Sequence, residues 1–317
     1  MQKKIKVLVY YGDLSEALVQ RIRDISGRVE VAVVNDDKSA LEAVVDAEVV
    51  FGKFNKELFS SAKRLRWVQT KGAGVDGLLF PEFIESNVAL TSASGIHGTQ
   101  ISEMIVAMML VFTKHLHKFM RYKFEAKWQP HTPDELAGKT VGILGLGSIG
   151  LETAKKAKCL GMKVIALKKH PNQKPDYVDE ILGSEGLENL LRQSDFVVLT
   201  LPLTSETRHM IGEEQLRSMK PTAYVINMGR GALIDTNALL KALKEGLIAG
   251  AGLDVFENEP LPADSDLWKL DNVVITPHVA GASPYYDERA VEVFCDNLKR
   301  HIEDKPLRNM VDKKAGY

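Results

Sequence analysis

Residues 141–150 constrain the fold of this chain more than any other segment of its sequence. They read Val-Gly-Ile-Leu-Gly-Leu-Gly-Ser-Ile-Gly, an apolar run that enters a G-x-G-x-x-G pattern, and a helical pattern follows over residues 151–160. In such a strand–turn–helix unit, Gly145 permits the tight turn, Gly147 lets the backbone approach a pyrophosphate, and Gly150 lets the helix pack on the strand. The segment therefore predicts a dinucleotide-binding unit. The alternative is an ordinary tight turn between a strand and a helix.

Composition narrows the class of protein. At 317 residues the chain is long for a single hydrophobic core, so we expect two domains. A net charge of −1 provides no field that would attract nucleic acid or an anionic membrane. Cys159 and Cys295 have no metal-ligand spacing, so we predict no metal site and buried free thiols in a reducing compartment. The N-terminus lacks the apolar core of a signal peptide, and these features together predict a cytoplasmic protein.

The apolar segment 101–120 approaches the length of a membrane span. Charged residues such as Glu103, Lys114 and Lys118 interrupt it, and charges are costly at the centre of a bilayer. We therefore expect one long helix that is buried at a domain or subunit interface.

Strands and helices alternate twice along the chain. Val-rich strands are expected at residues 7–11, 29–34, 47–52, 67–70 and 88–91, and then at 141–144, 164–167, 196–199, 224–227, 252–255 and 273–276. Helices are expected to begin near residues 15, 38 and 56, and to span 151–160, 187–193, 214–219, 236–245 and 286–302. This alternation predicts an α/β fold with two doubly wound parallel-sheet domains. The last helix is expected to return to the first domain.

Three residues of complementary chemistry follow strands of the second predicted sheet. Arg230, Glu259 and His278 each come shortly after a strand, and ligands of open α/β sheets bind beyond the carboxyl ends of the strands. Singly, Arg230 reads equally well as a solvated loop residue, His278 as a hydrogen-bonded turn histidine, and Glu257 as the relevant acid instead of Glu259. Together, at one edge of one sheet, the three predict an active site.

These residues lie in an ordered set of motifs that resembles the D-isomer-specific 2-hydroxyacid dehydrogenase family. The similar elements are Gly72-Ala-Gly-Val-Asp76, the glycine pattern, Leu201-Pro-Leu-Thr204, Asn227-Met-Gly-Arg-Gly231, Ile234-Asp235, Gly252-Leu-Asp-Val-Phe-Glu257, Glu259-Pro-Leu-Pro262, Leu267-Trp268, Thr276-Pro-His278 and Ala280-Gly281. The resemblance implies a Rossmann dinucleotide-binding domain, residues 99–281, inserted into a flavodoxin-like substrate domain formed by residues 1–98 and 282–317.

The resemblance also implies roles for individual residues. Arg230 would bind the carboxylate and carbonyl of a 2-oxo acid, His278 would exchange a proton with the carbonyl oxygen, and Glu259 would favour and orient the imidazolium. Substrate-binding residues are expected to be Lys71, Gly72, Ala73, Gly74, Arg230 and His278. Asp254 would bond the nicotinamide carboxamide. Cofactor-binding residues are expected to be Gly145, Gly147, Ser148, Ile149, Gly150, Lys168, Lys169, Leu201, Pro202, Thr207, Met228, Gly229, Arg230, Asp254, His278 and Gly281.

The end of the second strand of this domain departs from the pattern of NAD-specific proteins. An acidic residue there bonds the ribose 2′-hydroxyl, whereas this chain has Lys168, followed by Lys169 and His170. No carboxylate repels a 2′-phosphate, and the ammonium groups suit one, so we predict that NADP is preferred over NAD. The alternative is that these lysines are solvated surface residues.

The sequence therefore predicts an NAD(P)-dependent reductase of a small 2-oxo acid such as glyoxylate or hydroxypyruvate, with a small molecule as its partner. Phosphoglycerate dehydrogenase is the enzymatic alternative. Formate dehydrogenase fits less well because that branch pairs its histidine with glutamine. A nucleotide-sensing co-repressor on the same scaffold is the alternative of another class. The apolar segments 101–120 and 122–128, together with the resemblance, predict a homodimer.

Overall fold

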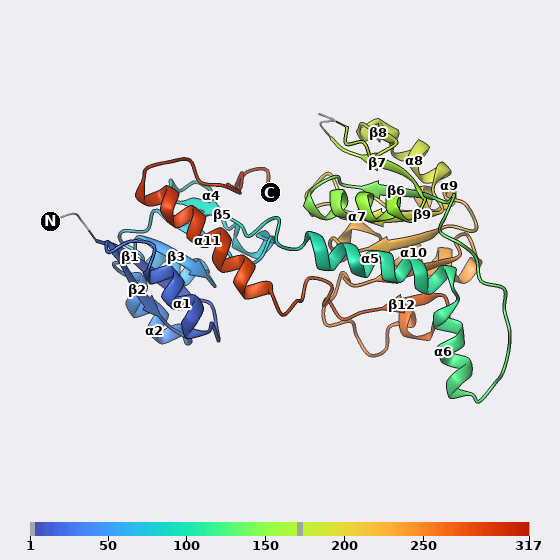
Figure 1. Cartoon of the computed structure of the whole chain (residues 1–317), viewed down its shortest axis with the longest axis horizontal. Helices are drawn as coiled ribbons and strands as arrows, with labels where there is room; N and C mark the ends of the chain where they lie inside the picture. The colour runs from blue at the N-terminus through green and yellow to red at the C-terminus, as the bar shows by residue number, and fades with distance from the viewer. Residues whose placement is uncertain (1–3, 170–173, 317) are drawn as a thin grey trace. The chain divides into compact units, whose positions relative to one another are not determined.

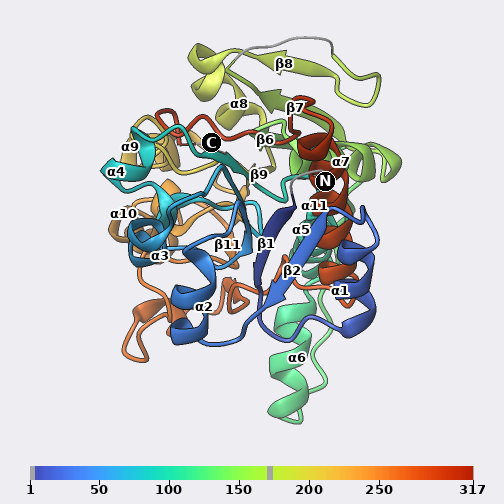
Figure 2. The same ribbon diagram turned by 90° about the vertical axis from the view of Figure 1, so that its left-hand side faces the viewer.

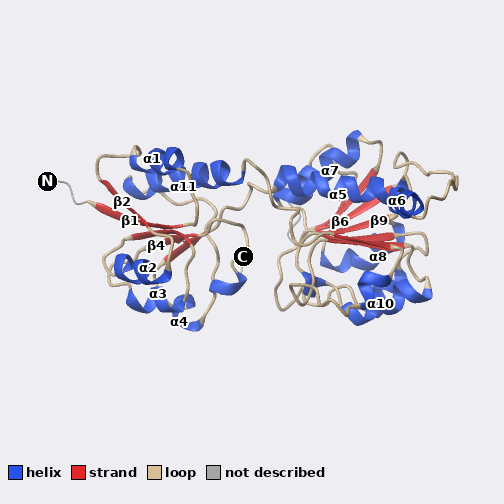
Figure 3. Ribbon diagram, turned by 90° about the horizontal axis from the view of Figure 1, so that it is seen from below, coloured by secondary structure: helices blue, strands red, loops and turns tan. Residues whose placement is uncertain are grey.

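The computed structural model describes residues 4–169 and 174–316. The chain forms two compact units, which are labelled by element in Figure 1. Unit 1 comprises Met1–Ile96 and Ser283–Tyr317, and unit 2 comprises His97–Ala282. Each unit contains one parallel sheet with helices on both faces (Figure 3). The prediction of two doubly wound parallel-sheet domains is confirmed.

Unit 1 has a five-stranded sheet in the order β2-β1-β3-β4-β5, which is the flavodoxin-like order. Its elements are β1 (Ile5–Tyr10), α1 (Glu16–Arg23), β2 (Val29–Val33), α2 (Asp37–Val44), β3 (Val49–Gly52), α3 (Lys56–Ser61), β4 (Trp67–Gln69), η1 (Asp76–Leu78), α4 (Pro81–Ile84), β5 (Ala89–Thr91) and α11 (Tyr286–Ile302). Helices α1 and α11 cover one face of the sheet and α2 covers the other (Figures 2 and 3).

Alternation of side chains along the strands explains this two-sided packing. Val7 and Val9 face the core under α1 and α11, whereas Leu8 and Tyr10 face the core under α2, α3 and α4. The C-terminal helix is held by stacked aromatic rings: Phe294 lies 4.2 Å from Phe51 and 5.3 Å from Trp67, centroid to centroid. Helix α11 is therefore an integral part of unit 1, although it is distant from the other elements in sequence.

Unit 2 has a seven-stranded sheet in the order β12-β11-β10-β9-β6-β7-β8, with parallel pairing throughout its described ladders. Its elements are α5 (Gly98–Thr113), α6 (Leu116–Phe124), β6 (Thr140–Leu144), α7 (Ser148–Cys159), β7 (Lys163–Leu167), β8 (Glu180–Leu182), η2 (Ser184–Gly186), α8 (Leu187–Gln193), β9 (Phe196–Leu199), α9 (Glu213–Ser218), β10 (Tyr224–Asn227), η3 (Gly231–Leu233), α10 (Thr236–Glu245), β11 (Gly250–Leu253), η4 (Asp266–Lys269) and β12 (Val273–Ile275). Helices α5 and α7 pack on one face of the sheet, and α8, α9 and α10 pack on the other. Strand β8 was not expected from the sequence. The expectation of two buried thiols was wrong for Cys159, which is exposed at the end of α7, whereas Cys295 is buried.

The expectation of one long helix over residues 101–120 was wrong. Helix α5 ends at Thr113 and α6 begins at Leu116, because His115 between them has a left-handed backbone with φ of 55°. A left-handed residue interrupts the i→i−4 ladder, so α6 leaves in a new direction and projects from the sheet (Figure 1). Within residues 4–169 and 174–316, no helix has both the length and the apolar character needed to cross a membrane.

Candidate active site

Both sheets have a point at which the order of their strands reverses. In unit 2 this switch point lies between β6 and β9, and in unit 1 it lies between β1 and β3. Loops diverge there at the carboxyl ends of the strands, which leaves a crevice for a ligand. The candidate site residues are therefore expected to lie in the loops at these two edges.

The glycine turn of unit 2 joins β6 to α7. Gly145 has a φ of 101°, which an L side chain rarely adopts. A Cβ on Gly150 would lie 2.1 Å from the carbonyl oxygen of Gly145, so only glycine lets α7 start this close to the strand. A Cβ on Gly147, by contrast, would meet no atom within 4 Å. The turn is therefore tight where helix meets strand and open at Gly147.

The open side of this turn suits a pyrophosphate. Gly147 caps α7, and the N–H groups of Ser148, Ile149 and Gly150 in the first turn have no acceptor within the helix. Together with the positive end of the helix dipole, they form a donor set for an anion. The residues present therefore fit the dinucleotide that the sequence predicts.

The loop after β9 packs against two other loops of the same edge. A Cβ on Gly145 would lie 3.0 Å from Cδ2 of Leu201, and one on Gly229 would lie 2.8 Å from the carbonyl oxygen of Leu201. The Thr207 hydroxyl donates to the carbonyl of Pro202 over 2.8 Å and closes the loop on itself. Leu201, Pro202, Thr207 and Gly229 thus lie beside the glycine turn. Met228, which precedes Gly229, is buried.

Arg230 follows β10 in a loop that its neighbours fix. The buried Asn227 side chain accepts from the N–H of Gly229 over 3.1 Å and donates to the carbonyl of Arg230 over 2.9 Å. A Cβ on Gly231 would lie 1.9 Å from the carbonyl carbon of Phe256, so only glycine allows the two loops to touch. This contact brings the Arg230 loop against the loop that carries Glu257 and Glu259.

His278 and Glu259 form a hydrogen-bonded pair. The distance from His278 Nδ1 to Glu259 Oε2 is 2.6 Å, and Glu259 Oε1 accepts from the N–H of Phe256 over 2.9 Å. Because a carboxylate only accepts, Nδ1 carries the hydrogen of this bond and Nε2 is the ring nitrogen that points elsewhere. The imidazole is half exposed, so Nε2 can be reached by a ligand.

Asp254 holds the backbone on which His278 stands. Its buried carboxylate accepts from the Thr276 hydroxyl at 2.5 Å and from the N–H groups of Val279 and Ala280, each at 3.0 Å. The carbonyl of Asp254 also accepts from the N–H of His278 at 2.8 Å. These bonds fix the tight turn in which His278 has a left-handed φ of 52°.

Glu257 belongs to a second histidine–glutamate pair. Its Oε1 lies 2.5 Å from Nε2 of His209, and its Oε2 accepts from the N–H of Thr236 over 3.3 Å. Burial acts to raise the pKa of Glu257, but the hydrogen bonds from Thr236 and His209 outweigh it and lower that pKa. The sequence left open whether Glu257 or Glu259 acts with His278. In the structure, Glu259 is the residue bonded to it.

His97, a buried residue at the start of α5, was missed by the sequence analysis. A Cβ on Gly281 would lie 3.1 Å from its ring, and Gln100 Nε2 donates to the carbonyl of Gly281 over 3.2 Å. Burial lowers the pKa of His97, and the nearby cation of Arg230 lowers it further. Both effects disfavour the protonated form of His97. A single histidine before a helix carried no signal that could have identified it.

The lysines at the end of β7 have different surroundings. The N–H of Lys168 donates to the carbonyl of Leu182 over 3.0 Å and anchors the end of the strand. Lys169 Nζ lies 2.6 Å from a carboxylate oxygen of Glu206, a residue 37 positions away in the loop after β9. The charge of Lys169 is thus opposed by an acid that the sequence analysis did not consider. His170 lies outside the described residues.

In unit 1, residues 71–74 form the loop after β4. The carbonyl of Gly72 accepts from the N–H of Ala93 over 2.9 Å and from the Thr70 hydroxyl over 2.6 Å. Lys71, Gly72 and Gly74 line a cavity of about 560 Å³ at the carboxyl edge of the sheet, and Ala73 is exposed. Three of the four predicted substrate residues of this unit thus line an open space.

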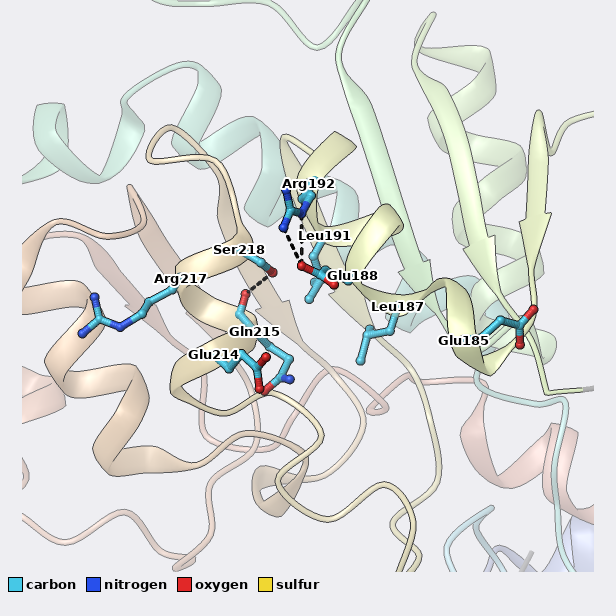
Figure 4. Close-up of a pocket in the computed structure, with 9 residues that line it drawn as sticks. All are labelled: Glu185, Leu187, Glu188, Leu191, Arg192, Glu214, Gln215, Arg217 and Ser218. Atoms are coloured by element: carbon cyan, nitrogen blue, oxygen red, sulfur yellow. Dashed lines mark hydrogen bonds and ion pairs between the residues drawn. The ribbon is translucent and has the colours of Figure 1, made fainter.

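A second cavity, of about 450 Å³, lies between α8 and α9 (Figure 4). Its lining includes the bonded pair Glu188 and Arg192, and it includes none of the predicted site residues. The part of the chain that the structure describes contains no cluster of His, Cys, Asp and Glu that suits a metal ion. The second cavity is therefore not part of the candidate site.

Comparison with known proteins identifies the family. A model of the "D-isomer specific 2-hydroxyacid dehydrogenase, NAD binding domain" matches residues 106–280. The glyoxylate reductase of Pyrococcus horikoshii is 38% identical, covering 87% of this chain and 88% of that protein. The D-3-phosphoglycerate dehydrogenase of Methanocaldococcus jannaschii is 32% identical, covering 97% of this chain and 59% of that protein.

A solved structure extends the similarity to the whole chain. The NADPH-dependent glyoxylate/hydroxypyruvate reductase from Sinorhizobium meliloti, in complex with NADP and sulfate, has a TM-score of 0.87 and 30% identity, covering 99% of this chain and 100% of that chain. The protein belongs to the D-isomer-specific 2-hydroxyacid dehydrogenase family, with the NAD-binding domain of that family in unit 2.

Proposed function

We propose that the protein reduces small 2-oxo acids to D-2-hydroxy acids with NADPH, and that Arg230, Glu259 and His278 are its catalytic residues. The observation that carries this proposal is the bond of 2.6 Å between His278 and Glu259, at the edge where the open glycine turn fits a dinucleotide. Membership of the dehydrogenase family supports the reaction type. Relatives named glyoxylate reductase and glyoxylate/hydroxypyruvate reductase support glyoxylate and hydroxypyruvate as the first substrates to test.

In the proposed mechanism the bound nicotinamide cofactor supplies the hydride. Arg230 binds the substrate carboxylate through its planar set of donors. His278 donates a proton from Nε2 to the carbonyl oxygen, because Nδ1 is already bonded to Glu259. Glu259 accepts the hydrogen bond from Nδ1 of His278 and fixes the plane of its ring. In the reverse direction His278 removes the proton from the hydroxyl group.

The same proposal assigns supporting roles. Asp254 positions His278 through the three hydrogen bonds that its carboxylate accepts from the surrounding turn. The same carboxylate would also accept a hydrogen bond from the nicotinamide carboxamide. In unit 1, the N–H groups of residues 71–74 bind the substrate carboxylate. The remaining cofactor residues act as the sequence predicts, with the glycine turn on the pyrophosphate and Leu201, Pro202, Thr207, Met228, Gly229 and Gly281 lining its path.

A preference for NADP over NAD is proposed from the end of β7. Lys168 stands where NAD-specific relatives have an acid, and the S. meliloti reductase was solved with NADP. Because Lys169 is paired with Glu206, Lys168 carries most of the attraction for a 2′-phosphate. Glu206 itself opposes binding of that phosphate, which makes the proposed preference moderate.

We also propose a cytoplasmic homodimer that assembles through α6. Leu116, Met120 and Phe124 are exposed, and their spacing of four places them on one face of the helix. Trp128, just beyond the helix, is 98% exposed. An apolar stripe of this kind on a projecting helix suits the self-complementary contact of a two-fold dimer. Light scattering at micromolar concentration should give twice the chain mass. A monomer would contradict the assembly.

A turnover assay tests the proposed function. Glyoxylate, hydroxypyruvate and 3-phosphohydroxypyruvate are each offered with NADPH and with NADH, and oxidation of the cofactor is followed by its absorbance. We expect reduction of at least one acid, faster with NADPH. Turnover of 3-phosphohydroxypyruvate alone would identify a phosphoglycerate dehydrogenase. Tight cofactor binding without turnover of any acid would contradict the proposal and favour a nucleotide-sensing protein.

A further inference from the structure

The cavity in unit 1 extends beyond the loop that is proposed to bind the substrate carboxylate. Residues of this loop form only one side of it, and the rest is lined by residues from the ends of β1 and β3 and from α2, α3, η1 and α11. Glyoxylate has no side chain that would enter such a space. A cavity of about 560 Å³ is within the usual range of roughly 300–1,000 Å³ for ligand sites, so it suits a substrate with a side chain.

Two lysines give this cavity its charge. Lys53 Nζ lies 5.2 Å from the centre of the Tyr10 ring, and Lys71 Nζ lies 5.5 Å from the centre of the Tyr11 ring. Contact with an aromatic face holds an ammonium group in place without neutralising it. Neither lysine forms an ion pair with a carboxylate of the described residues. Both cations are therefore available to a ligand.

One acid opposes them. Asp37 also lines the cavity, and one of its oxygens accepts a hydrogen bond of 2.5 Å from the Tyr10 hydroxyl. Among the described side chains of the lining, two lysines against one aspartate leave a net positive charge. The hydroxyl bond occupies one of the two oxygens of the Asp37 carboxylate.

The local backbone fixes Lys53 at this place. Gly52, the last residue of β3, has a φ of 114°, and a Cβ there would lie 2.3 Å from the carbonyl oxygen of Tyr10. Glycine thus lets the end of β3 approach the end of β1. The N–H of Lys53 then donates to that carbonyl over 2.6 Å. The lysine is therefore presented from the switch point of the sheet, where α/β proteins bind ligands.

We infer that this cavity binds an anionic group on the side chain of the 2-oxo acid through Lys53 and Lys71. The preferred substrates are then 2-oxo acids whose side chain carries a carboxylate or a phosphate. This inference rests on the proposed 2-oxo acid reductase activity and defines its substrate class. Charge-assisted bonds, discounted for exposure to solvent, predict roughly a tenfold gain in kcat/KM over an uncharged analogue.

Matched pairs of substrates test the inference. 2-Oxoglutarate is compared with 2-oxopentanoate, which has the same chain length, and 3-phosphohydroxypyruvate is compared with hydroxypyruvate. We expect kcat/KM to be about tenfold higher for the anionic member of at least one pair. The pair that shows the difference identifies the anion as a carboxylate or a phosphate.

Two variants assign the effect to the cavity. Lys53→Met should lower kcat/KM for the preferred anionic acid by about tenfold, mainly through KM, and should leave the uncharged analogue within about twofold. Lys56→Met is the matched control, because Lys56 pairs with Glu82 on the surface and does not line the cavity. The control variant should have the same kcat/KM as the parent for both members of each substrate pair.

Each outcome decides one of the two proposals. If the protein turns over 2-oxo acids without favouring the anionic members, or if Lys53→Met slows both members equally, the inference is overturned and the reductase proposal stands. If no acid is reduced, the reductase proposal fails. Calorimetry then measures the binding of 2-oxoglutarate and 3-phosphohydroxypyruvate to the parent and to Lys53→Met, which tests whether the cavity binds an anionic acid through Lys53. Equal affinities, or no binding to the parent, would overturn the inference.

Discussion

The carboxyl edges of the two sheets differ in how far their polar groups are already bonded within the protein. In unit 2, Asn227, Asp254 and Glu259 bond the loops that carry Arg230 and His278, so these loops are fixed. In unit 1, Lys53 and Lys71 rest on aromatic rings beside an open cavity. We infer a division of labour, in which unit 2 fixes the geometry of the reaction and unit 1 selects the side chain of the substrate.

The largest expected effect comes from removing the proton donor at the fixed edge. His278→Asn should bind cofactor normally but lower kcat by ~10²–10⁴-fold for every substrate, because it removes general acid catalysis. His209→Asn is the matched control, since His209 is also a left-handed histidine bonded to a glutamate of the same loop. Steady-state kinetics and cofactor titration measure both variants. Equal losses of kcat in the two variants would contradict a special role for the His278–Glu259 pair over the His209–Glu257 pair.

The next effect concerns the backbone of the open edge. Gly52→Ala should lower the free energy of unfolding by about 2 kcal/mol or more, because Gly52 has a positive φ and a Cβ would meet the Tyr10 carbonyl. Gly27→Ala, where a Cβ would meet no atom within 4 Å, is the control and should stay within about 0.5 kcal/mol of the parent. Denaturant unfolding measures both. A Gly52→Ala protein as stable as the parent would show that this edge is not constrained as described.

A smaller effect is expected at the cofactor end of unit 2. Lys168→Asp should lower kcat/KM for NADPH by roughly tenfold through repulsion of the 2′-phosphate, and should maintain or improve kcat/KM for NADH. Kinetics with both cofactors, before and after the change, give the comparison. If the parent prefers NADH, and the ratio of kcat/KM for NADPH to that for NADH is the same in Lys168→Asp, Lys168 is a solvated surface residue.

The smallest effect is a pH dependence at His97. Burial and the Arg230 cation lower the pKa of this histidine from 6.5, so the unfolded chain binds a proton at His97 more readily than the folded protein does. The free energy of unfolding should therefore fall as the pH drops below about 6.5. Between about pH 7 and 5, the free energy of unfolding should fall less in His97→Gln than in the parent. Identical pH profiles from denaturant unfolding would contradict this assignment.

The sequence predicted the central strands of the sheets well because they are buried on both faces. Continuous apolar runs such as β9 and β10 and the helices α8, α10 and α11 were located within the bounds observed. β8 was missed because it reads Glu-Ile-Leu and has only two apolar residues, whereas β12, which is equally short and lies at the other edge, reads Val-Val-Ile. The break at His115 was missed because nothing in its composition distinguishes a left-handed histidine from a helical one.

The site was predictable to the extent that loops follow strands. Arg230, Glu259 and His278 could be assigned to one edge because parallel strands end together. The pairing of Glu259 rather than Glu257 with His278 depends on side-chain distances that spacing does not define. The pair of Lys169 and Glu206 joins loops far apart in the chain, and the charge of the unit 1 cavity arises from separate strands.

Transfer of deuterium tests the central claim most directly. The protein is given NADPH that carries deuterium at both C4 positions of the nicotinamide, together with the best 2-oxo acid other than glyoxylate, whose product lacks a stereocentre. The product is analysed by mass spectrometry and chiral chromatography. The account predicts a D-2-hydroxy acid with deuterium at C2, formed at least about 100-fold more slowly by His278→Asn. A product without deuterium, an L-2-hydroxy acid, or undiminished transfer by His278→Asn would contradict it.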